Sequence, residues 1–318
     1  MNALVTGVAG FIGSHLAERL IKEGFRVVGV DAFTDNYPRK IKENNLKSLV
    51  TNPRFRFIEG DLISLNLEEI LKEVEVVFHQ AAIPGVRTSW GREFNRYVIN
   101  NILATQLILE ACKDRGNIKK FIYASSSSVY GDSCVLPLSE ATLTNPVSPY
   151  GVSKLAAEHL AVLYCKGYGV PTVSLRYFTV YGPRQRPDMS FHRFISAILT
   201  DGEIEIYGTG EQTRDFTFVD DVVEANIQAF LRGKEGEVYN IGGGSKIRLI
   251  DVVRIIEEVS GRKARLRHFD YQLGDAKHTY ADISKARVDL NYSPRITLYE
   301  GIKRHYEWLK KNLDIYEH

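Results

Sequence analysis

Short apolar runs alternate with amphipathic stretches along the first half of the chain. The apolar run at residues 3–6 is followed by glycines, and residues 11–23 then carry apolar side chains at helical spacing. The alternation continues to about residue 176, with further strands expected at residues 26–30, 55–59, 74–79, 121–124 and 172–175, and long helices at 94–115 and 150–167. Strand–helix alternation of this length predicts an α/β fold built on a doubly wound parallel sheet, the Rossmann arrangement.

The pattern loosens after about residue 176 into loops and shorter elements. Helices are expected at residues 219–231, 249–260 and 298–309, and a strand at residues 237–241 can return to the sheet. We therefore expect two domains. A Rossmann domain covers residues 1–176, with the chain returning to it around residues 216–241, and a smaller C-terminal α/β substrate-binding domain covers residues 177–318.

Bulk composition excludes several classes of protein. The 318 residues are 44% apolar and 25% charged, which is typical of a soluble globular protein, and a net charge of +2 provides no general attraction for nucleic acid. The three cysteines are widely spaced, so we expect neither a disulfide framework nor a metal site. The start MNALVTG lacks a basic segment, and no apolar run approaches the roughly 18 residues of a membrane span. We expect a cytoplasmic protein without a membrane partner.

A glycine-rich turn follows the first expected strand. In TGVAGFIGSHL, Gly7, Gly10 and Gly13 have the spacing GxxGxxG and open the first helix, together with Phe11 and Ile12. Glycines at such a turn let backbone N–H groups approach a pyrophosphate at a helix N-terminus. A plain tight turn would explain the glycines equally well, so the position between strand and helix is what favours a dinucleotide site.

Polar residues follow the ends of several expected strands, where ligands bind on parallel sheets. Asp31 ends the second strand, at the place of a carboxylate that accepts the adenosine ribose hydroxyls. Because a carboxylate there repels a 2′-phosphate, we expect NAD and not NADP as the cofactor. Asp61 and Leu62 follow the third strand and can meet the adenine, although Asp61 can equally be a helix N-cap.

A tyrosine and a lysine stand four residues apart in SPYGVSK. On a helix, Tyr150 and Lys154 then share one face, and we expect the ammonium to lower the pKa of the phenol. The preceding segment ASSSSVYG places Ser126 where its hydroxyl can reach the same substrate oxygen. With 17 tyrosines in the chain, this spacing alone is weak evidence, but its combination with the glycine turn is hard to obtain by chance.

These motifs, with HQAA, the pair at residues 100–101, RYF and TRDFTFVDD, resemble the extended short-chain dehydrogenase/reductases, and among them the nucleotide-sugar 4-epimerases. The resemblance implies Ser126, Tyr150 and Lys154 as catalytic residues and a bound NAD. It also implies that Asn101 supports the Tyr150 network, although Asn101 can equally be a helix-terminus residue. It implies that Tyr150 takes a proton from the sugar O4 while C4 passes hydride to NAD, and that hydride returns to the other face of the 4-keto sugar. The implied cofactor contacts are Gly7, Gly10, Phe11, Ile12, Gly13, Asp31, Asp61, Leu62, Gln80, Ala81, Ala82, Asn101, Ser125, Tyr150, Lys154, Tyr177 and Phe178.

Two features of the sequence narrow the reaction and the substrate. Related dehydratases and decarboxylases carry an acidic residue before VYG, where this chain has Ser128, so epimerisation is favoured. Many UDP-hexose epimerases have RYFN, whereas RYFT, VYGPRQRPDM and AAIPGVRTSWG resemble the UDP-glucuronate 4-epimerases. We expect Thr179, Ser127 and Arg87 to hold the carboxylate of a UDP-hexuronic acid, since hydroxyl and guanidinium donors suit a carboxylate better than an amide does.

The resemblance also implies a set of substrate contacts and a quaternary structure. The implied contacts are Pro84, Arg87, Ser126, Ser127, Tyr150, Thr179, Arg184, Met189, Phe191, Arg193, Arg214 and Asp275. Arg184 is the candidate for the diphosphate or uridine, and Arg186 can instead pair with Asp188. His192 and Arg193 can belong to a solvated helix face, and Arg214 to a surface ion pair. The family forms homodimers through its long helices. UDP-glucose as the substrate, a UDP-glucuronate decarboxylase, and a non-catalytic NAD sensor remain the alternatives.

Overall fold

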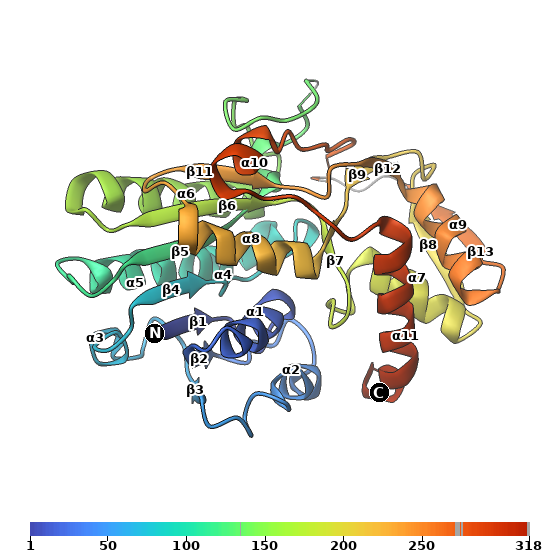
Figure 1. Cartoon of the computed structure of the whole chain (residues 1–318). Coiled ribbons are helices and arrows are strands. Elements are labelled where there is room, and N and C mark those ends of the chain that lie inside the picture. The colour runs from blue at the N-terminus through green and yellow to red at the C-terminus, as the bar shows by residue number, and fades with distance from the viewer. Residues whose placement is uncertain (134, 271–273, 275, 317–318) are drawn as a thin grey trace.

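A seven-stranded parallel sheet forms the centre of the computed structural model, which describes residues 1–133, 135–270, 274 and 276–316 (Figure 1). The strand order is β11-β6-β5-β4-β1-β2-β3, and each neighbouring pair is parallel. This order reverses direction next to β1, as in doubly wound folds. The strands are β1 (Asn2–Thr6), β2 (Arg26–Asp31), β3 (Phe55–Glu59), β4 (Val76–His79), β5 (Lys120–Ser126), β6 (Thr172–Tyr177) and β11 (Val238–Ile241).

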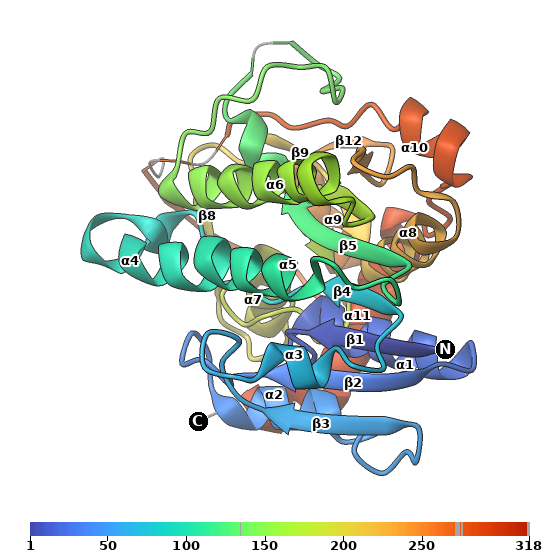
Figure 2. The same cartoon turned by 90° about the vertical axis from the view of Figure 1, so that its left-hand side faces the viewer.

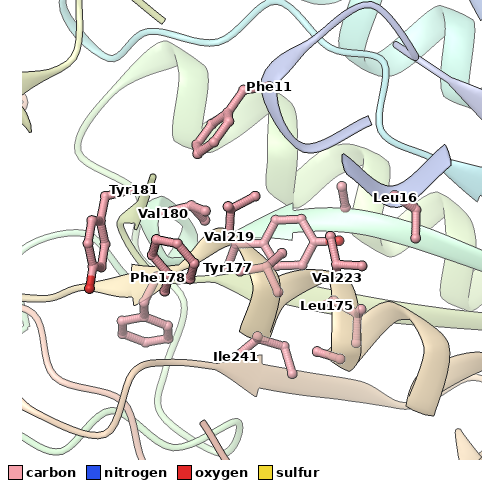
Figure 3. Packing of buried hydrophobic residues seen from close by; sticks show 14 of the residues in the cluster. Phe11, Leu16, Leu175, Tyr177, Phe178, Val180, Tyr181, Val219, Val223 and Ile241 are labelled. Atoms are coloured by element: carbon pink, nitrogen blue, oxygen red, sulfur yellow. The ribbon is translucent and has the colours of Figure 1, made fainter. Parts of the chain in front are cut away.

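Helices cover both faces of the sheet. Successive residues of a strand point to opposite faces, so Ala3 and Val5 join one buried cluster whereas Leu4 joins the other. On the first face, Figure 3 shows Val219 and Val223 of α8 beside Leu175 and Tyr177 of β6. The helices of this face are α1 (Phe11–Lys22), α2 (Arg39–Leu46) and α8 (Val219–Arg232), and those of the other are α3 (Leu67–Ile70), α5 (Ala104–Cys112) and α6 (Pro149–Tyr168).

The helix expected at residues 94–115 has a wide central segment. It begins as α4 (Phe94–Tyr97), continues as a π-helix, η3 (Val98–Leu103), and ends as α5. Figure 2 shows this helical stack beside α6. Asn101 lies within the π-helical segment and is buried. Such π-helical insertions often occur next to functional sites, and no feature of the apolar pattern marks this one.

The chain crosses between two parts of the molecule after β6. Strands β8 (Glu203–Tyr207) and β13 (Arg265–Phe269) pair in parallel beside α7 (Ser190–Leu199), α9 (Leu249–Ser260) and α11 (Leu298–Tyr316). The chain returns to the main sheet through α8 and β11, and α10 (Ser284–Leu290) packs there as well. The remaining short elements are η1 (Arg87–Ser89), η2 (Gly91–Glu93), η4 (Ser127–Tyr130), β7 (Val180–Tyr181), β9 (Thr213–Asp215), β10 (Thr217–Phe218) and β12 (Lys246–Arg248).

None of the helices in the described part of the chain combines the length and the apolar character that a membrane span requires.

Candidate active site

A cleft of about 670 Å³ lies at the carboxyl ends of the sheet strands. Its wall on the sheet side comes from the residues that follow β1 to β6, and its opposite wall comes from α7 and β8 of the C-terminal part. The lining includes these expected cofactor residues: Gly7, Gly10, Phe11, Ile12, Gly13, Asp31, Asp61, Leu62, Gln80, Ala81, Ala82, Ser125, Tyr150, Lys154, Tyr177 and Phe178. It also includes these expected substrate residues: Pro84, Arg87, Ser126, Ser127, Tyr150, Thr179, Met189, Arg193 and Arg214.

The glycine-rich turn is shaped for the close approach of a ligand. Gly7 has a φ of +67°, and a Cβ added there would lie 2.8 Å from the backbone nitrogen of Ala81. A Cβ at Gly13 would lie 2.2 Å from the Gly7 carbonyl oxygen, so helix and turn pack together without room for a side chain. No side chain caps the start of α1 at Gly10, and its first turn has no acidic residue. This helix terminus therefore suits a dinucleotide pyrophosphate.

Asp31 is fixed at the end of β2. Its Oδ2 accepts from the Ala9 N–H at 3.0 Å and its Oδ1 from the Phe33 N–H at 2.9 Å. Burial raises the pKa of Asp31, while the Phe33 N–H and the Lys42 ammonium oppose that shift. Lys42 also lines the cleft, and its Nζ donates to Asn36 Oδ1 at 2.9 Å. Lys42 lies in a basic helix, α2, whose sequence pattern predicts no ligand contact.

The alternative of a helix N-cap does not hold for Asp61. The side chain that caps the next helix is Asn66, which accepts from the Glu69 N–H at 3.1 Å. Asp61 instead accepts from the Ile63 N–H at 3.2 Å within a turn. Asp61 and Leu62 therefore lie together on the cleft wall beyond β3.

Tyr150 and Lys154 occupy the first turns of α6, which Ser148 caps by accepting from the Gly151 N–H at 3.1 Å. Ser126, at the end of β5, accepts from the Ser128 N–H at 3.1 Å, so its own proton is available to Tyr150 or to a substrate oxygen. Hydrogen bonding by Ser126 lowers the pKa of Tyr150, and the charge of Arg186 acts in the same direction. Burial is the larger effect and raises the pKa of Tyr150 overall.

The expected effect of Lys154 on Tyr150 is absent in this structure. Burial lowers the pKa of Lys154 to about 7, and its Nζ lies over the ring of Tyr123, 4.6 Å from the centroid. The prediction that Lys154 lowers the pKa of the phenol is therefore wrong for this arrangement. The physical reason is that both groups are desolvated, and desolvation disfavours the phenolate and the ammonium alike.

A hydrogen-bond network supports the inner end of the cleft. The Tyr177 hydroxyl accepts from Asn226 Nδ2 at 2.8 Å and lies 3.2 Å from Gln80 Oε1, and Gln80 Nε2 donates to Asn226 Oδ1 at 3.1 Å. Asn226 is fully buried on α8 and was missed by the sequence analysis. Its place in the sequence, within an amphipathic helix, carries no signal of this contact.

Asn101 lies behind the cleft wall and holds that wall in place. Its Oδ1 accepts from the Ile83 N–H at 2.7 Å, and its Nδ2 donates to the Ile83 carbonyl at 3.0 Å and to Ser153 Oγ at 2.9 Å. Asn101 therefore links the segment after β4 to the helix that carries Tyr150. This geometry agrees with the expected support of the Tyr150 network, while Asn101 lies outside the cleft lining, where a cofactor contact was also expected of it.

The two arginines at residues 184 and 186 have different positions. Arg184 has a φ of +65° and donates from Nη2 to Glu18 Oε1 of α1 at 2.8 Å, outside the cleft lining. Arg186 lies on the lining and makes a two-pronged pair with Asp188, with N–O distances of 3.0 and 2.8 Å. The expectation that Arg184 binds substrate is corrected by this placement, since its guanidinium is already engaged on another surface.

Other side chains of the 184–214 region also differ from expectation. Phe191 is fully buried and packs behind Phe216, with 4.7 Å between ring centroids, so Phe216 is the aromatic ring that lines the cleft. His192 is buried, in contrast to the solvated face considered for it, whereas Arg193 lies on the cleft wall and pairs with Glu205. Asp275 lies outside the described residues.

Four arginines line the cleft. The Arg87 guanidinium stacks on the ring of Tyr207, 4.3 Å from the centroid, across the two walls. Arg214 donates from Nη1 to the carbonyl oxygens of Thr213 and Lys277, each at 3.0 Å. With Arg193 and Arg186, these residues give the cleft a set of cations near a wall that also holds Tyr150.

The chain is similar to known proteins over most of its length. Residues 3–242 match the model of the NAD dependent epimerase/dehydratase family. The chain belongs to this family. Its relatives include an uncharacterized UDP-glucose epimerase of Bacillus subtilis, 47% identical with 97% of this chain and 98% of the relative covered. They also include a UDP-glucuronate 4-epimerase of Thermodesulfobacterium geofontis, 40% identical with 98% and 97% covered.

A solved member of the epimerase/dehydratase family has nearly the same fold. The crystal structure of UDP-glucuronic acid 4-epimerase from Bacillus cereus, in complex with UDP-glucuronic acid and NAD, is 47% identical. It superimposes with a TM-score of 0.95 and covers 98% of this chain and 100% of that one. The family resemblance that the motifs indicated, and the Rossmann architecture, are thereby confirmed.

Proposed function

We propose that this protein is an NAD-dependent epimerase that inverts C4 of a UDP-hexuronic acid and interconverts UDP-glucuronate and UDP-galacturonate through a 4-keto intermediate. The observation that carries the proposal is the grouping of hydroxyl and guanidinium donors around Tyr150. Ser126, Ser127, Thr179 and Arg87 line the same cleft as Tyr150. Such donors suit a substrate with a carboxylate next to the reacting carbon.

The residues of the chain divide the chemical work. The glycine turn and Asp31 would hold NAD, which would supply a hydride acceptor for C4 of the sugar. Tyr150 removes the proton from the sugar O4 and later gives it back, and Ser126 donates a hydrogen bond to the same oxygen. Lys154 supplies positive charge on the same face of α6. The glycine turn, Asp31 and the Tyr177 network orient the cofactor so that hydride transfer occurs at one end of the cleft.

The carboxylate must also be protected during the reaction. A 4-keto uronate is a β-keto acid, which loses CO₂ when its C5–C6 bond stands perpendicular to the carbonyl plane. Thr179 is half-buried, and its backbone carbonyl is fixed by the Thr217 N–H at 2.9 Å. We infer that Thr179 and Ser127, with Arg87, hold the carboxylate out of this alignment. Ser128, where related dehydratases have an acid, leaves no carboxylate beside Ser126 and Ser127 in that turn.

The nucleotide end of the substrate is assigned to the arginine-lined part of the cleft. We place Arg186, Arg193 and Arg214 at the diphosphate, because guanidinium groups bind phosphate oxygens in a fixed two-pronged geometry. Arg186 replaces Arg184 in this role. We place Phe216, which lines the cleft in front of the buried Phe191, beside the uracil. Existing pairs with Asp188 and Glu205 hold these guanidinium groups at the cleft wall.

We also propose that the protein is a cytoplasmic homodimer. The helical segment that contains η3 lies beside α6 (Figure 2). Both carry exposed apolar side chains, which are Val98 and Leu103 on η3 and Val152 and Leu163 on α6. A second copy of the chain would cover them. Light scattering during size-exclusion chromatography should give twice the chain mass of 36.0 kDa. A monomer at micromolar concentration would contradict the dimer.

One assay tests the proposed reaction. The protein is incubated separately with UDP-glucuronate and UDP-glucose, and the 4-epimers are separated by chromatography. We expect UDP-galacturonate from the first, and turnover of UDP-glucose alone would show that the substrate assignment is wrong. Tyr150→Phe is expected to lose at least about 100-fold in kcat while it keeps its NAD, because a positioned acid–base group contributes at least that much. Unchanged turnover in this variant would remove Tyr150 from the mechanism.

A further inference from the structure

A buried carboxylate lies one helical turn beyond Lys154. Glu158 is on α6, four residues after Lys154 and eight after Tyr150, so the three side chains share one face of the helix. Glu158 is 2% exposed and lies behind the cleft lining. Carboxylates are rarely this buried unless they are paired, so its partners indicate what it does.

Glu158 accepts three hydrogen bonds from two residues. Arg176 of β6 donates from Nε at 2.9 Å and from Nη2 at 2.6 Å to its two oxygens, and Ser125 of β5 donates from Oγ at 2.6 Å. Arg176 also donates from Nη1 to the Tyr130 hydroxyl at 2.7 Å, and that hydroxyl donates to Asn240 Oδ1 of β11 at 2.7 Å. The carboxylate is therefore fixed relative to β5, β6, β11 and α6.

This network connects directly to the catalytic strand. Ser125 precedes Ser126, and its hydroxyl is turned to Glu158. Arg176 precedes Tyr177, which supports the inner end of the cleft. A displacement of Glu158 would thus change the positions of Ser126 and Tyr177 and the surroundings of Lys154.

The surroundings of Lys154 contain few charges that could balance its own. His79 of β4 is buried and neutral, because desolvation and the charge of Lys154 lower its pKa to about 3. Tyr123 of β5 presents its ring, and burial holds its pKa well above the ordinary value. Tyr150 is on the same helix and is a neutral phenol at rest. Burial lowers the pKa of Lys154, and the charge of Glu158 opposes that shift, so that the pKa lies at about 7.

We infer that Glu158, fixed by Arg176 and Ser125, is a positioning residue whose charge increases the fraction of Lys154 that is an ammonium beside Tyr150. The expected effect of Glu158 on turnover rests on the proposed function. The expected effect of Glu158 on the ionisation of Lys154 does not, because it can be measured without substrate. The plain alternative is that Glu158 does nothing beyond pairing with Arg176. Under that alternative, a neutral pair of similar size should serve equally well.

The experiment compares three proteins with the natural chain. Glu158→Gln removes the charge and leaves Arg176 unpaired. The double variant E158Q/R176M replaces the whole pair by neutral side chains, which commonly preserves or restores stability. Glu110→Gln is the matched control, because Glu110 also accepts a hydrogen bond from α6, through Tyr164 at 2.6 Å, but lies on the exposed surface.

The first measurement does not depend on turnover. Each protein is trace-labelled with acetic anhydride across a pH range, and labelling of the Lys154 peptide is read by mass spectrometry. The natural chain should show a midpoint near 7. Glu158→Gln should show a midpoint lower by about 1 to 3 pH units, which is the usual effect of one nearby opposite charge. E158Q/R176M should show a smaller decrease, because it removes the opposing charge of Arg176 as well. The control should match the natural chain.

The second measurement follows kcat and KM for UDP-glucuronate against pH. Both Glu158 variants should lose kcat near pH 7.5, by at least about tenfold in Glu158→Gln and by less in E158Q/R176M, with KM changed less than about threefold and the alkaline limb moved to lower pH. The melting temperature should fall for Glu158→Gln and recover in E158Q/R176M.

The inference is overturned if the Lys154 midpoint is unchanged in E158Q/R176M, or if that variant recovers kcat together with stability. If Glu158→Gln does not fold, the Lys154 midpoint and the kcat of E158Q/R176M test the inference by themselves. Failure of the natural chain to convert UDP-glucuronate would overturn the proposed function, and the labelling midpoints would still test the role of Glu158.

Discussion

The guanidinium of Arg184 pairs with the carboxylate of Glu18 at 2.8 Å and ties the loop before α7 to α1. The pair is partly buried, with side-chain exposures of 18% and 25%, and it lowers the pKa of Glu18. Arg186, two residues later, faces the cleft. Neighbouring arginines of one loop thus have separate tasks, one structural and one directed at the ligand.

This separation predicts opposite phenotypes for two alanine variants. Arg186→Ala should lower kcat/KM for UDP-glucuronate by about 10- to 100-fold, because it removes a charge-assisted contact worth about 1.5–3 kcal/mol. Arg184→Ala should instead lower the free energy of unfolding by about 1–2 kcal/mol and leave kcat/KM within about threefold. Kinetics and urea denaturation of both variants provide the measurement. Equal kinetic losses in the two variants would contradict the assignment.

Thr179 should control the fate of the keto intermediate. Thr179→Ala removes a hydroxyl from the carboxylate, so the fraction of product that has lost CO₂ should rise by about tenfold, the effect of one hydrogen bond. Mass spectrometry of the UDP-sugar mixture distinguishes the keto-pentose from the uronates. Thr179→Ser keeps the hydroxyl and should behave like the natural chain. An unchanged product ratio in Thr179→Ala would show that the carboxylate is held elsewhere.

Asp31 should decide between NAD and NADP. Asp31→Asn removes the charge that opposes a 2′-phosphate and leaves Lys42 nearby as a cation. The ratio of the Kd for NADP to that for NAD should fall by at least about tenfold, measured by titration of protein freed of bound cofactor. Asp61→Asn, on the same cleft wall, should change both constants together and leave their ratio as it was.

Acid should destabilise the fold through its buried histidines. His79, His192 and His305 are buried, and burial lowers their pKa values to about 3, to about 4 and well below 6.5. The unfolded chain binds protons on these groups below about pH 6.5 while the folded chain does not, so stability falls as the pH falls. Together they contribute a slope of about 4 kcal/mol per pH unit between roughly pH 6 and pH 4.

His305 offers a direct measurement of this effect, because neither ring nitrogen has a hydrogen-bond partner among the described residues. His305→Leu should reduce the slope of unfolding free energy against pH by about 1.4 kcal/mol per pH unit. Denaturant titrations at several pH values between neutrality and pH 5 give the slope. A variant with the slope of the natural chain would contradict the neutral, buried state of His305.

The sheet and the motifs at its edge were predictable because their signals are local. Each signal lies within a short segment of the sequence: the apolar runs, the glycine spacing, and the four-residue spacing of Tyr150 and Lys154. The helix at residues 94–115 was predicted without its π-helical segment, because a short π-helical segment hardly alters the spacing of apolar residues. The resemblance to nucleotide-sugar epimerases extended these signals to the reaction.

The sequence by itself determined a Rossmann sheet, a dinucleotide turn and the Ser126, Tyr150 and Lys154 set. Only the tertiary structure decided which arginine faces the cleft, and that burial, and not the charge of Lys154, dominates the pKa of the phenol. It also decided the pairing of Glu158 with Arg176 from the neighbouring strand. The physical reason is that local spacing fixes which side chains share a face, whereas burial and charge pairing depend on segments that meet only in the folded chain.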